Sequence, residues 1–304
     1  MKIATYTRGS RRGLGAIVGD TIVDLTTADP ELPSDMIAFL EAGPAAIARA
    51  AAAVAVRGSP MALADVRIEA PIGRPPKILA VGLNYADHIR ETGAVRPTVP
   101  VIFNKQSTAV IGPGRAVLIP PESSCVDYEG ELAIVIGSRC RRVDRARARE
   151  VIAGFTICND VSVRDWQKRT PTMTMGKSWD THCPLGPFLV TVDEIPDPQA
   201  LGLVTRVNGE VRQRVSTADM VFDCYELVAH LSTAFTLEVG DVISTGTPAG
   251  VGMAMSPPSW LRAGDVVSIE IDGIGTLENP IEAEGVLSGE CDPGGPREPR
   301  RPGP

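Results

Sequence analysis

Two glutamates, Glu129 and Glu131, lie two residues apart at the start of an apolar run. The run Leu132 to Ile136 is partly β-branched and ends at Gly137, a pattern typical of a buried strand. Because side chains alternate between the faces of a strand, we expect both carboxylates to point the same way. Neighbouring carboxylates repel each other unless a cation lies between them, and hard oxygen ligands suit Mg²⁺, Mn²⁺ or Ca²⁺ better than zinc. The alternative is a solvated strand end at which both glutamates face water.

A third carboxylate, Asp160, follows another apolar run. Residues Phe155 to Asn159 predict a strand that delivers Asp160 at its end, where a site for a hard metal would need one more ligand. The alternative for Asp160 is the N-cap of a following helix. Arg164 and Gln167 come next, three residues apart, and a surface ion pair is the simplest alternative role for Arg164.

A histidine and a glutamate, His88 and Glu91, fall on a short helical pattern that ends at Gly93. Residues three apart share one helical face, and a carboxylate beside an imidazole can orient the ring and raise its basicity, as a general base requires. An exposed ion pair without function is the alternative. The Gly- and Pro-containing loop 93–100 follows, so the segment that carries the pair is predicted to be a mobile lid.

Two further segments carry polar groups that could serve the same site. The stretch 176–187 is dense in glycine, proline and polar residues, and Lys177 could receive negative charge that develops near a metal. His182, in the same stretch, is expected to make a structural hydrogen bond. Thr247 lies in the stretch Val242 to Pro248, which predicts a strand that runs into a Gly-Thr-Pro turn, where hydroxyl and N–H groups could bind a carboxylate. An ordinary turn is the alternative there.

The composition limits the class of protein. The chain has 304 residues, of which 43% are hydrophobic, so a sizeable core is expected. The net charge of −7 argues against nucleic acid or an anionic membrane as the main partner. The first residues lack the apolar core of a signal peptide, and no apolar run has the length of a membrane span. Six scattered cysteines without a CxxC pair fit reduced thiols, so a cytoplasmic location is predicted.

The elements that must position these residues fall into two predicted domains, in a strand-rich α+β fold. Residues 1–72 predict a small N-terminal α+β domain with a helix capped by Ser34 and an alanine-rich helix from Ala45 to Val56. Residues 76–283 predict the larger catalytic domain, in which Arg145 to Gly154 is expected to be helical. Residues 284–304 are rich in proline, glycine and charge, and they predict a disordered tail.

Five motifs, taken in order, resemble the fumarylacetoacetate hydrolase family. They are Asn84 to His88, Asp127 to Ala133, Asn159 to Gln167, Gly176 to Thr181 and Thr245 to Pro248. The resemblance covers residues 76–282, and it is greatest to the FAHD2-like branch with its small N-terminal domain. It implies a mixed β-sandwich roll, a homodimer, and one divalent cation per subunit, Mg²⁺ or Mn²⁺ before Ca²⁺.

The resemblance also implies a role for each matching residue. The metal ligands would be Glu129, Glu131 and Asp160. The catalytic residues would be a lid pair that activates water and a lysine that stabilises an enolate: His88, Glu91 and Lys177. The substrate-contacting positions would be Arg164, Gln167 and Thr247. Two departures from the family pattern, Val163 and Trp179, are expected to border the pocket.

These roles predict a metal-dependent hydrolase that cleaves a C–C bond in a 2,4-dioxo acid, such as an acylpyruvate or fumarylpyruvate. His88 would activate water, the metal would act as Lewis acid for the departing enolate, and Lys177 would neutralise its charge. The same groups permit decarboxylation of an oxaloacetate-type acid, or a 2-hydroxymuconate-type isomerase or hydratase reaction. A binding protein without activity is a further alternative, against which the intact set of site residues speaks. The expected partner is a small 2-oxo or dioxo acid.

Overall fold

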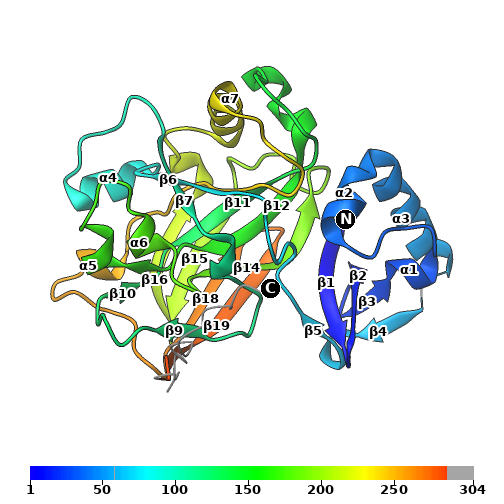
Figure 1. The fold of residues 1–304 in the computed structure, drawn as a ribbon, viewed down its shortest axis with the longest axis horizontal. Helices are drawn as coiled ribbons and strands as arrows, with labels where there is room; N and C mark the ends of the chain where they lie inside the picture. The colour runs from blue at the N-terminus through cyan, green and yellow to red at the C-terminus, as the bar shows by residue number, and fades with distance from the viewer. Residues whose placement is uncertain (58, 286–304) are drawn as a thin grey trace, which may run out of the picture.

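The computed structural model describes residues 1–57 and 59–285 (Figure 1). Strands form a 12-stranded sheet, a five-stranded sheet and a two-stranded ladder, which confirms the predicted strand-rich α+β class. No helix in this part of the chain is long and apolar enough to cross a membrane. The predicted disordered tail lies outside the described residues from position 286 onward.

The N-terminal part combines short strands with three helices, drawn in blue in Figure 1. Its strands are β1 (Lys2–Arg8), β2 (Arg11–Val18), β3 (Thr21–Asp24), β4 (Pro60–Ala62) and β5 (Arg67–Ile68). Its helices are α1 (Leu25–Ala28), α2 (Met36–Glu41) and α3 (Gly43–Arg57). The predicted cap of α2 is wrong by one residue, because the carboxylate of Asp35, not Ser34, accepts the N–H of Ile37 at 2.9 Å.

The central sheet joins the N-terminal strands to the rest of the molecule. Its order is β4-β3-β2-β1-β14-β12-β11-β17-β6-β7. The further members are β6 (Ile78–Gly82), β7 (Val101–Lys105), β8 (Val110–Ile111), β11 (Gly130–Ile136), β12 (Ile152–Asn159), β14 (Cys183–Thr191) and β17 (Val242–Ser244). Lys2 of β1 pairs with Val190 of β14, so one sheet runs through both predicted domains. The domain boundary at residues 72–76 stays a prediction.

The five-stranded sheet has the order β16-β15-β18-β19-β9. Its strands are β9 (Val117–Ile119), β15 (Gly202–Val207), β16 (Glu210–Ser216), β18 (Val266–Ile271) and β19 (Gly275–Ala283). The predicted hairpin turn between β15 and β16 is confirmed. Its central residues, Asn208 and Gly209, have φ values of 54° and 80°, as a two-residue turn with left-handed backbone requires.

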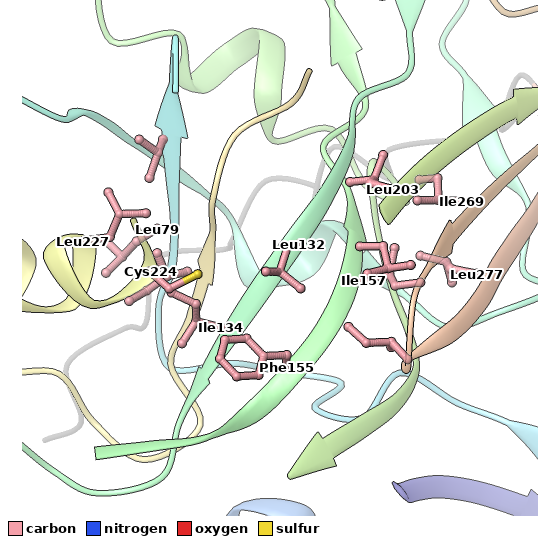
Figure 2. Close-up of a cluster of buried hydrophobic side chains, with 14 of the residues drawn as sticks. Leu79, Leu132, Ile134, Phe155, Ile157, Leu203, Cys224, Leu227, Ile269 and Leu277 are labelled. Atoms are coloured by element: carbon pink, nitrogen blue, oxygen red, sulfur yellow. The ribbon is translucent and has the colours of Figure 1, made fainter. Parts of the chain in front are cut away.

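A hydrophobic core lies between the two sheets and a helix (Figure 2). Leu132 of β11 and Ile157 of β12 approach Leu203 and Ile269 of the five-stranded sheet, while α7 (Cys224–Ala234) contributes Leu227. Each large apolar side chain that is fully buried stabilises the fold by about 1.5–3 kcal/mol. All residues of β11 and β12 are buried, so the ends of these two strands form a rigid base.

The short helices α4 (Ala86–Thr92), α5 (Arg164–Gln167) and α6 (Thr174–Lys177) gather on the side of the molecule away from the N-terminal part (Figure 1). The helix predicted for Arg145 to Gly154 is wrong, because only a 3₁₀ segment forms up to Val151 and β12 begins at Ile152. Pairing of the apolar residues of β12 with two neighbouring strands outweighs the helical propensity of the preceding Ala and Arg residues. Gly154 lies within the strand, where an added Cβ would come 2.1 Å from the carbonyl oxygen of Val190.

Candidate metal centre and active-site pocket

Three carboxylates meet where β11 and β12 end. Glu129 precedes β11, Glu131 lies in it, and Asp160 follows β12, so the pairing of these strands brings the three together. The Asp160 N–H donates to the carbonyl of Glu129 at 2.9 Å. Their potential ligand oxygens lie within 4.8 Å of one another. All three residues are at most 5% exposed, which excludes the alternative that both glutamates face water.

Two buried cations contact two of these carboxylates. The Nζ atom of Lys177 lies 2.6 Å from Glu129 Oε2 and 2.7 Å from Asp160 Oδ2, and Arg164 Nη1 lies 2.6 Å from Glu129 Oε1. Burial by itself raises the pKa of Glu129, but Lys177 and Arg164 outweigh this effect and lower its pKa. Burial likewise lowers the pKa of Lys177, but Asp160 and Glu129 outweigh it and raise its pKa. These ion pairs therefore consist of charged groups.

Glu131 has a different environment. Its Oε2 atom accepts hydrogen bonds from the Ser244 hydroxyl at 2.5 Å and from the Gly246 N–H at 2.9 Å. Burial, and then the carboxylates of Asp160 and Glu129, raise the pKa of Glu131 well above its usual value. Among the described residues, no salt bridge reaches Glu131. A divalent ion would supply the missing positive charge, and an all-carboxylate donor set fits Mg²⁺ or Mn²⁺.

Two more charged residues complete the cluster, and neither is among the site residues that were predicted from the sequence. Lys105, at the end of β7, has a side chain that is 0% exposed, and its Nζ lies 2.6 Å from Asp160 Oδ1. Asp127 lies in β10 (Val126–Asp127), which pairs with β13 (Ser162–Val163), and it accepts the Arg164 Nε–H at 2.9 Å. The sequence feature that could have indicated Lys105 is its place as a charged residue at the end of an apolar strand. The four carboxylates face three cations, so the fully ionised cluster has one excess negative charge.

The predicted histidine–glutamate pair forms on α4. His88 Nδ1 lies 3.0 Å from Glu91 Oε2, and the helix ends at Gly93, which has a φ of 67°. The side chains are 8% and 22% exposed, so His88 is not part of an exposed surface pair. The second oxygen of Glu91 accepts the Gly250 N–H at 2.8 Å. Gly250 therefore fixes the glutamate that orients the histidine.

One cavity of about 260 Å³ is lined by His88 of the pair and by two of the three carboxylates, whereas Glu91 and Asp160 do not line it. His88, Glu129, Glu131, Arg164 and Lys177 line it on the polar side. Its apolar wall consists of Val81, Leu83, Val101, Phe103, Met173 and Met253. A larger groove of about 690 Å³ lies between α3 and the ends of β12 and β14. That groove is mostly apolar and none of the predicted site residues line it, so the smaller cavity is the candidate active site.

Gln167 and Thr247 also line the cavity. The Thr247 hydroxyl donates to the Gly130 carbonyl at 3.1 Å and accepts from Gln213 Nε2 at 2.8 Å, so its single hydrogen is already engaged. It could serve a substrate as an acceptor but not as a donor. Gln167 Oε1 accepts from Arg164 Nη1 at 3.0 Å and its Nε2 donates one hydrogen to Met173 Sδ at 3.5 Å, which leaves the second amide hydrogen as the potential donor.

The expectation that Val163 and Trp179 border the pocket is wrong, because neither lines the cavity. Val163 belongs to β13 and is buried in the core. Trp179 packs edge-on against Trp166, with ring centroids 5.0 Å apart. Ala94 is the residue of the predicted lid loop that lines the cavity.

Comparisons with known proteins place the chain among related enzymes. Residues 77–282 match the family described as fumarylacetoacetate (FAA) hydrolase C-terminal. The chain is 44% identical over 270 residues to the oxaloacetate tautomerase Fahd2a, mitochondrial, of Rattus norvegicus, with 88% of this chain and 86% of that protein covered.

Solved structures are similar over most of the chain as well. A fumarylacetoacetate hydrolase from Exiguobacterium antarcticum has a TM-score of 0.83 at 36% identity, covering 93% of this chain and 100% of that one. A maleylpyruvate hydrolase from Sphingobium sp. SYK-6, solved with manganese(II) and pyruvate, has a TM-score of 0.77 at 32% identity. The match covers 94% of this chain and 100% of the maleylpyruvate hydrolase chain.

Proposed function

This chain belongs to the fumarylacetoacetate hydrolase family, and from that premise we propose that it is a metal-dependent tautomerase of a short, oxaloacetate-type 2-oxo acid. The observation that carries the proposal is that His88 lines the same small cavity as Lys177, Glu129 and Glu131, the last two of which form a buried carboxylate cluster with Asp160. Keto–enol tautomerisation needs a base for a carbon-bound proton and positive charge for the oxygen that becomes negative. His88 and Lys177 in the same cavity could meet both needs. The name of the rat relative supports the choice of substrate class.

The charge balance of the cluster supports an acidic substrate. Three carboxylates around a divalent ion would carry a net negative charge and would repel another carboxylate. With Asp127 and the cations Lys105, Arg164 and Lys177 included, the cluster has one excess negative charge. A divalent ion changes this to one excess positive charge. The buried cations therefore make the loaded site an acceptor for anions.

The proposed chemistry uses the residues as they are placed. Glu129, Glu131 and Asp160 would hold the ion, which when bound supplies a Lewis acid for the 2-oxo group. His88 donates its Nδ1–H to Glu91, so Nε2 is the ring nitrogen that is available to take a proton from carbon 3. Lys177 Nζ donates to Glu129 Oε2 and Asp160 Oδ2, and its third hydrogen would be donated to the oxygen that becomes negative. Return of a proton to that oxygen gives the enol, and no water is consumed.

Hydrolysis of a C–C bond in a 2,4-dioxo acid is the second candidate function. From the sequence alone it was the first prediction. The observation that favours it is the similarity to a maleylpyruvate hydrolase that was solved with manganese and pyruvate. In that reaction His88 would activate water instead of removing a carbon-bound proton. Decarboxylation and the isomerase or hydratase reactions stay alternatives on the same site. The choice between Mg²⁺ and Mn²⁺, the homodimer and the cytoplasmic location stay predictions.

The proposal is tested with the purified protein and Mg²⁺ or Mn²⁺. Loss of the ultraviolet absorbance of enol oxaloacetate is followed with and without EDTA, and total oxaloacetate is measured by LC–MS. Faster enol loss at constant total oxaloacetate, abolished by EDTA, is the expected result. Carbon dioxide release from oxaloacetate would point to a decarboxylase. Acetylpyruvate and fumarylpyruvate are assayed in parallel. Formation of pyruvate and an acid from these substrates, without any effect on enol oxaloacetate, would replace the tautomerase with the hydrolase.

A further inference from the structure

Lys105 is a fully buried charge that does not line the active-site cavity. Its Nζ atom donates to Asp160 Oδ1 at 2.6 Å and to the Val161 carbonyl at 3.3 Å. It also donates to the carbonyl of Lys177. A lysine ammonium has three hydrogens to donate, so these contacts use its full capacity. Lys105 therefore acts on other residues of the protein and does not touch a substrate in the cavity.

These contacts join three segments that are distant in the sequence. They are the end of β7, the residues that follow β12 and the last residue of α6. Because Lys105 binds Asp160 Oδ1, the oxygen of Asp160 that faces Lys177 Nζ is Oδ2, at 2.7 Å. The strand β7 supports Lys177 a second time, since its Nζ lies 4.9 Å from the centroid of the Phe103 ring. One strand thus positions both a carboxylate and an ammonium of the site.

We propose that Lys105 is the positioning residue of the metal centre. It holds Asp160 by one oxygen, so that the other oxygen is presented as a ligand, and it fixes the main chain of Lys177 at a set distance from that ligand. The inference rests on the proposed metal site but not on the reaction. An ordinary buried ion pair that serves only stability is the competing explanation.

The chain offers a matched control for that explanation. Lys77 Nζ lies 2.7 Å from Asp241 Oδ2, and the Asp241 side chain is 0% exposed, as is that of Asp160. Neither Lys77 nor Asp241 lines the cavity. Lys77→Met and Lys105→Met therefore each remove a lysine partner from a fully buried carboxylate, although the Lys77 side chain is 32% exposed and that of Lys105 is 0% exposed. Loss of stability is expected in both variants, whereas loss of metal binding is expected only in Lys105→Met.

The experiment is a Mn²⁺ titration of the full chain by calorimetry after removal of bound metal. Lys105→Met is expected to bind Mn²⁺ about 10- to 100-fold more weakly than the wild type, as is typical when a residue that orients a ligand is lost. Removal of a positive charge alone would strengthen cation binding, so weaker binding reports lost orientation. Lys77→Met should bind Mn²⁺ as the wild type does. Ethylammonium added to Lys105→Ala should restore part of the affinity, and it should leave Lys77→Ala unchanged.

Wild-type affinity in Lys105→Met would overturn the inference, as would an equal loss of affinity in Lys77→Met. If Lys105→Met does not fold, Lys105→Gln takes its place, because its amide keeps one donor for Asp160. Lys105→Gln is expected to bind Mn²⁺ more weakly than the wild type, and equal binding would overturn the inference. Glu131→Gln separates this inference from the proposed function. If neither the wild type nor Glu131→Gln binds Mn²⁺, the metal site itself is refuted.

Discussion

Glu129 and Glu131 of the carboxylate cluster line one cavity together with His88 of the His88–Glu91 pair, but different structures support the cluster and the pair. The carboxylates stand at the ends of β11 and β12, two adjacent strands whose residues are all buried. The pair lies on α4, which has seven residues. Two hydrogen bonds that involve side chains connect α4 to the rest of the protein. The Asp87 N–H donates to Asp219 Oδ2 at 3.0 Å, and Glu91 Oε1 accepts the Gly250 N–H at 2.8 Å.

This difference separates two tasks of the site. A metal centre needs ligands whose positions are set before the ion arrives, and strands inside a packed core provide such positions. An acid–base pair must let substrate enter and then come within hydrogen-bond distance of it. A short helix with few attachments, followed by the loop 93–100, suits that motion. Changes on the strand side should therefore affect metal binding, and changes on the helix side should affect turnover.

The largest effect is expected from Glu131→Gln. The amide keeps the shape of the side chain but removes the charge that the divalent ion needs, so Mn²⁺ affinity should fall by more than about a hundredfold. Burial and the neighbouring carboxylates make an ionised Glu131 unfavourable without metal, so the metal-free variant should fold normally. Calorimetry and circular dichroism measure the two properties. Undiminished metal-dependent turnover would contradict the assignment of Glu131 as a ligand.

His88→Ala should act on turnover alone. Loss of the general base should lower kcat for tautomerisation about 10²- to 10⁴-fold, with Mn²⁺ affinity unchanged. Decarboxylation of oxaloacetate should lose less, because it does not require removal of a proton from carbon 3. His230→Ala is the matched control, since His230 is exposed on α7. Equal losses in tautomerisation and decarboxylation would refute the role of His88 as the base.

Gly250→Ala should have a smaller effect, through Glu91. Gly250 has a φ of 101°, and an added Cβ would lie 2.0 Å from the carbonyl oxygen of Arg212, so the main chain must shift. The shift displaces the N–H that holds Glu91, and we expect kcat to fall about ten- to hundredfold with Mn²⁺ affinity unchanged. Gly264→Ala is the control, because Gly264 has a φ of 97° but nothing within 4 Å of its Cβ position. If both variants lose the same activity, backbone strain and not the Glu91 contact is responsible.

The smallest effect on the site is expected from His182, which belongs to the supporting structure. Burial lowers its pKa to about 4, against the opposing effect of its contact with the Leu118 carbonyl at 2.8 Å. Between about pH 6.5 and about pH 4 the unfolded chain binds a proton there that the folded chain does not. Stability should therefore decrease as the pH falls through this range, by about 3 kcal/mol at most. Urea unfolding at pH 7 and pH 5 measures the decrease, and His182→Gln should reduce it. A decrease of the same size in the variant would assign it to other groups.

The sequence was sufficient for those parts of the site that short patterns encode. Glu129, Glu131 and Asp160 stand beside apolar runs that had to be strands, and the spacing of His88 and Glu91 required one helical face. It was not sufficient for residues whose partners are distant in the sequence. Lys105 meets Asp160 only because β7 and the end of β12 come together in the fold, and no local pattern reports that contact.

The same limit explains the wrongly predicted helix and the contacts of Lys177 that were not predicted. Arg145 to Gly154 has the composition of a helix, but strand pairing with β11 and β14 decides the structure from Ile152 onward. The role of Lys177 toward negative charge on a substrate stays a prediction. In the fold, its Nζ contacts Glu129 and Asp160, two of the proposed metal ligands. The place of Lys177 next to Gly176 in the sequence gives no information about its contacts with the two carboxylates.

The pairing of β1 with β14 has a consequence for the newly made chain. Lys2 and Ile3 pair with Val190 and Leu189, so these two residues of β1 lack their partners in β14 until residue 190 has been synthesised. During this interval the start of β1 is an open strand edge, which can pair with another nascent chain. Synthesis speed and chaperone contact over this interval should therefore influence how much of the protein reaches its native state.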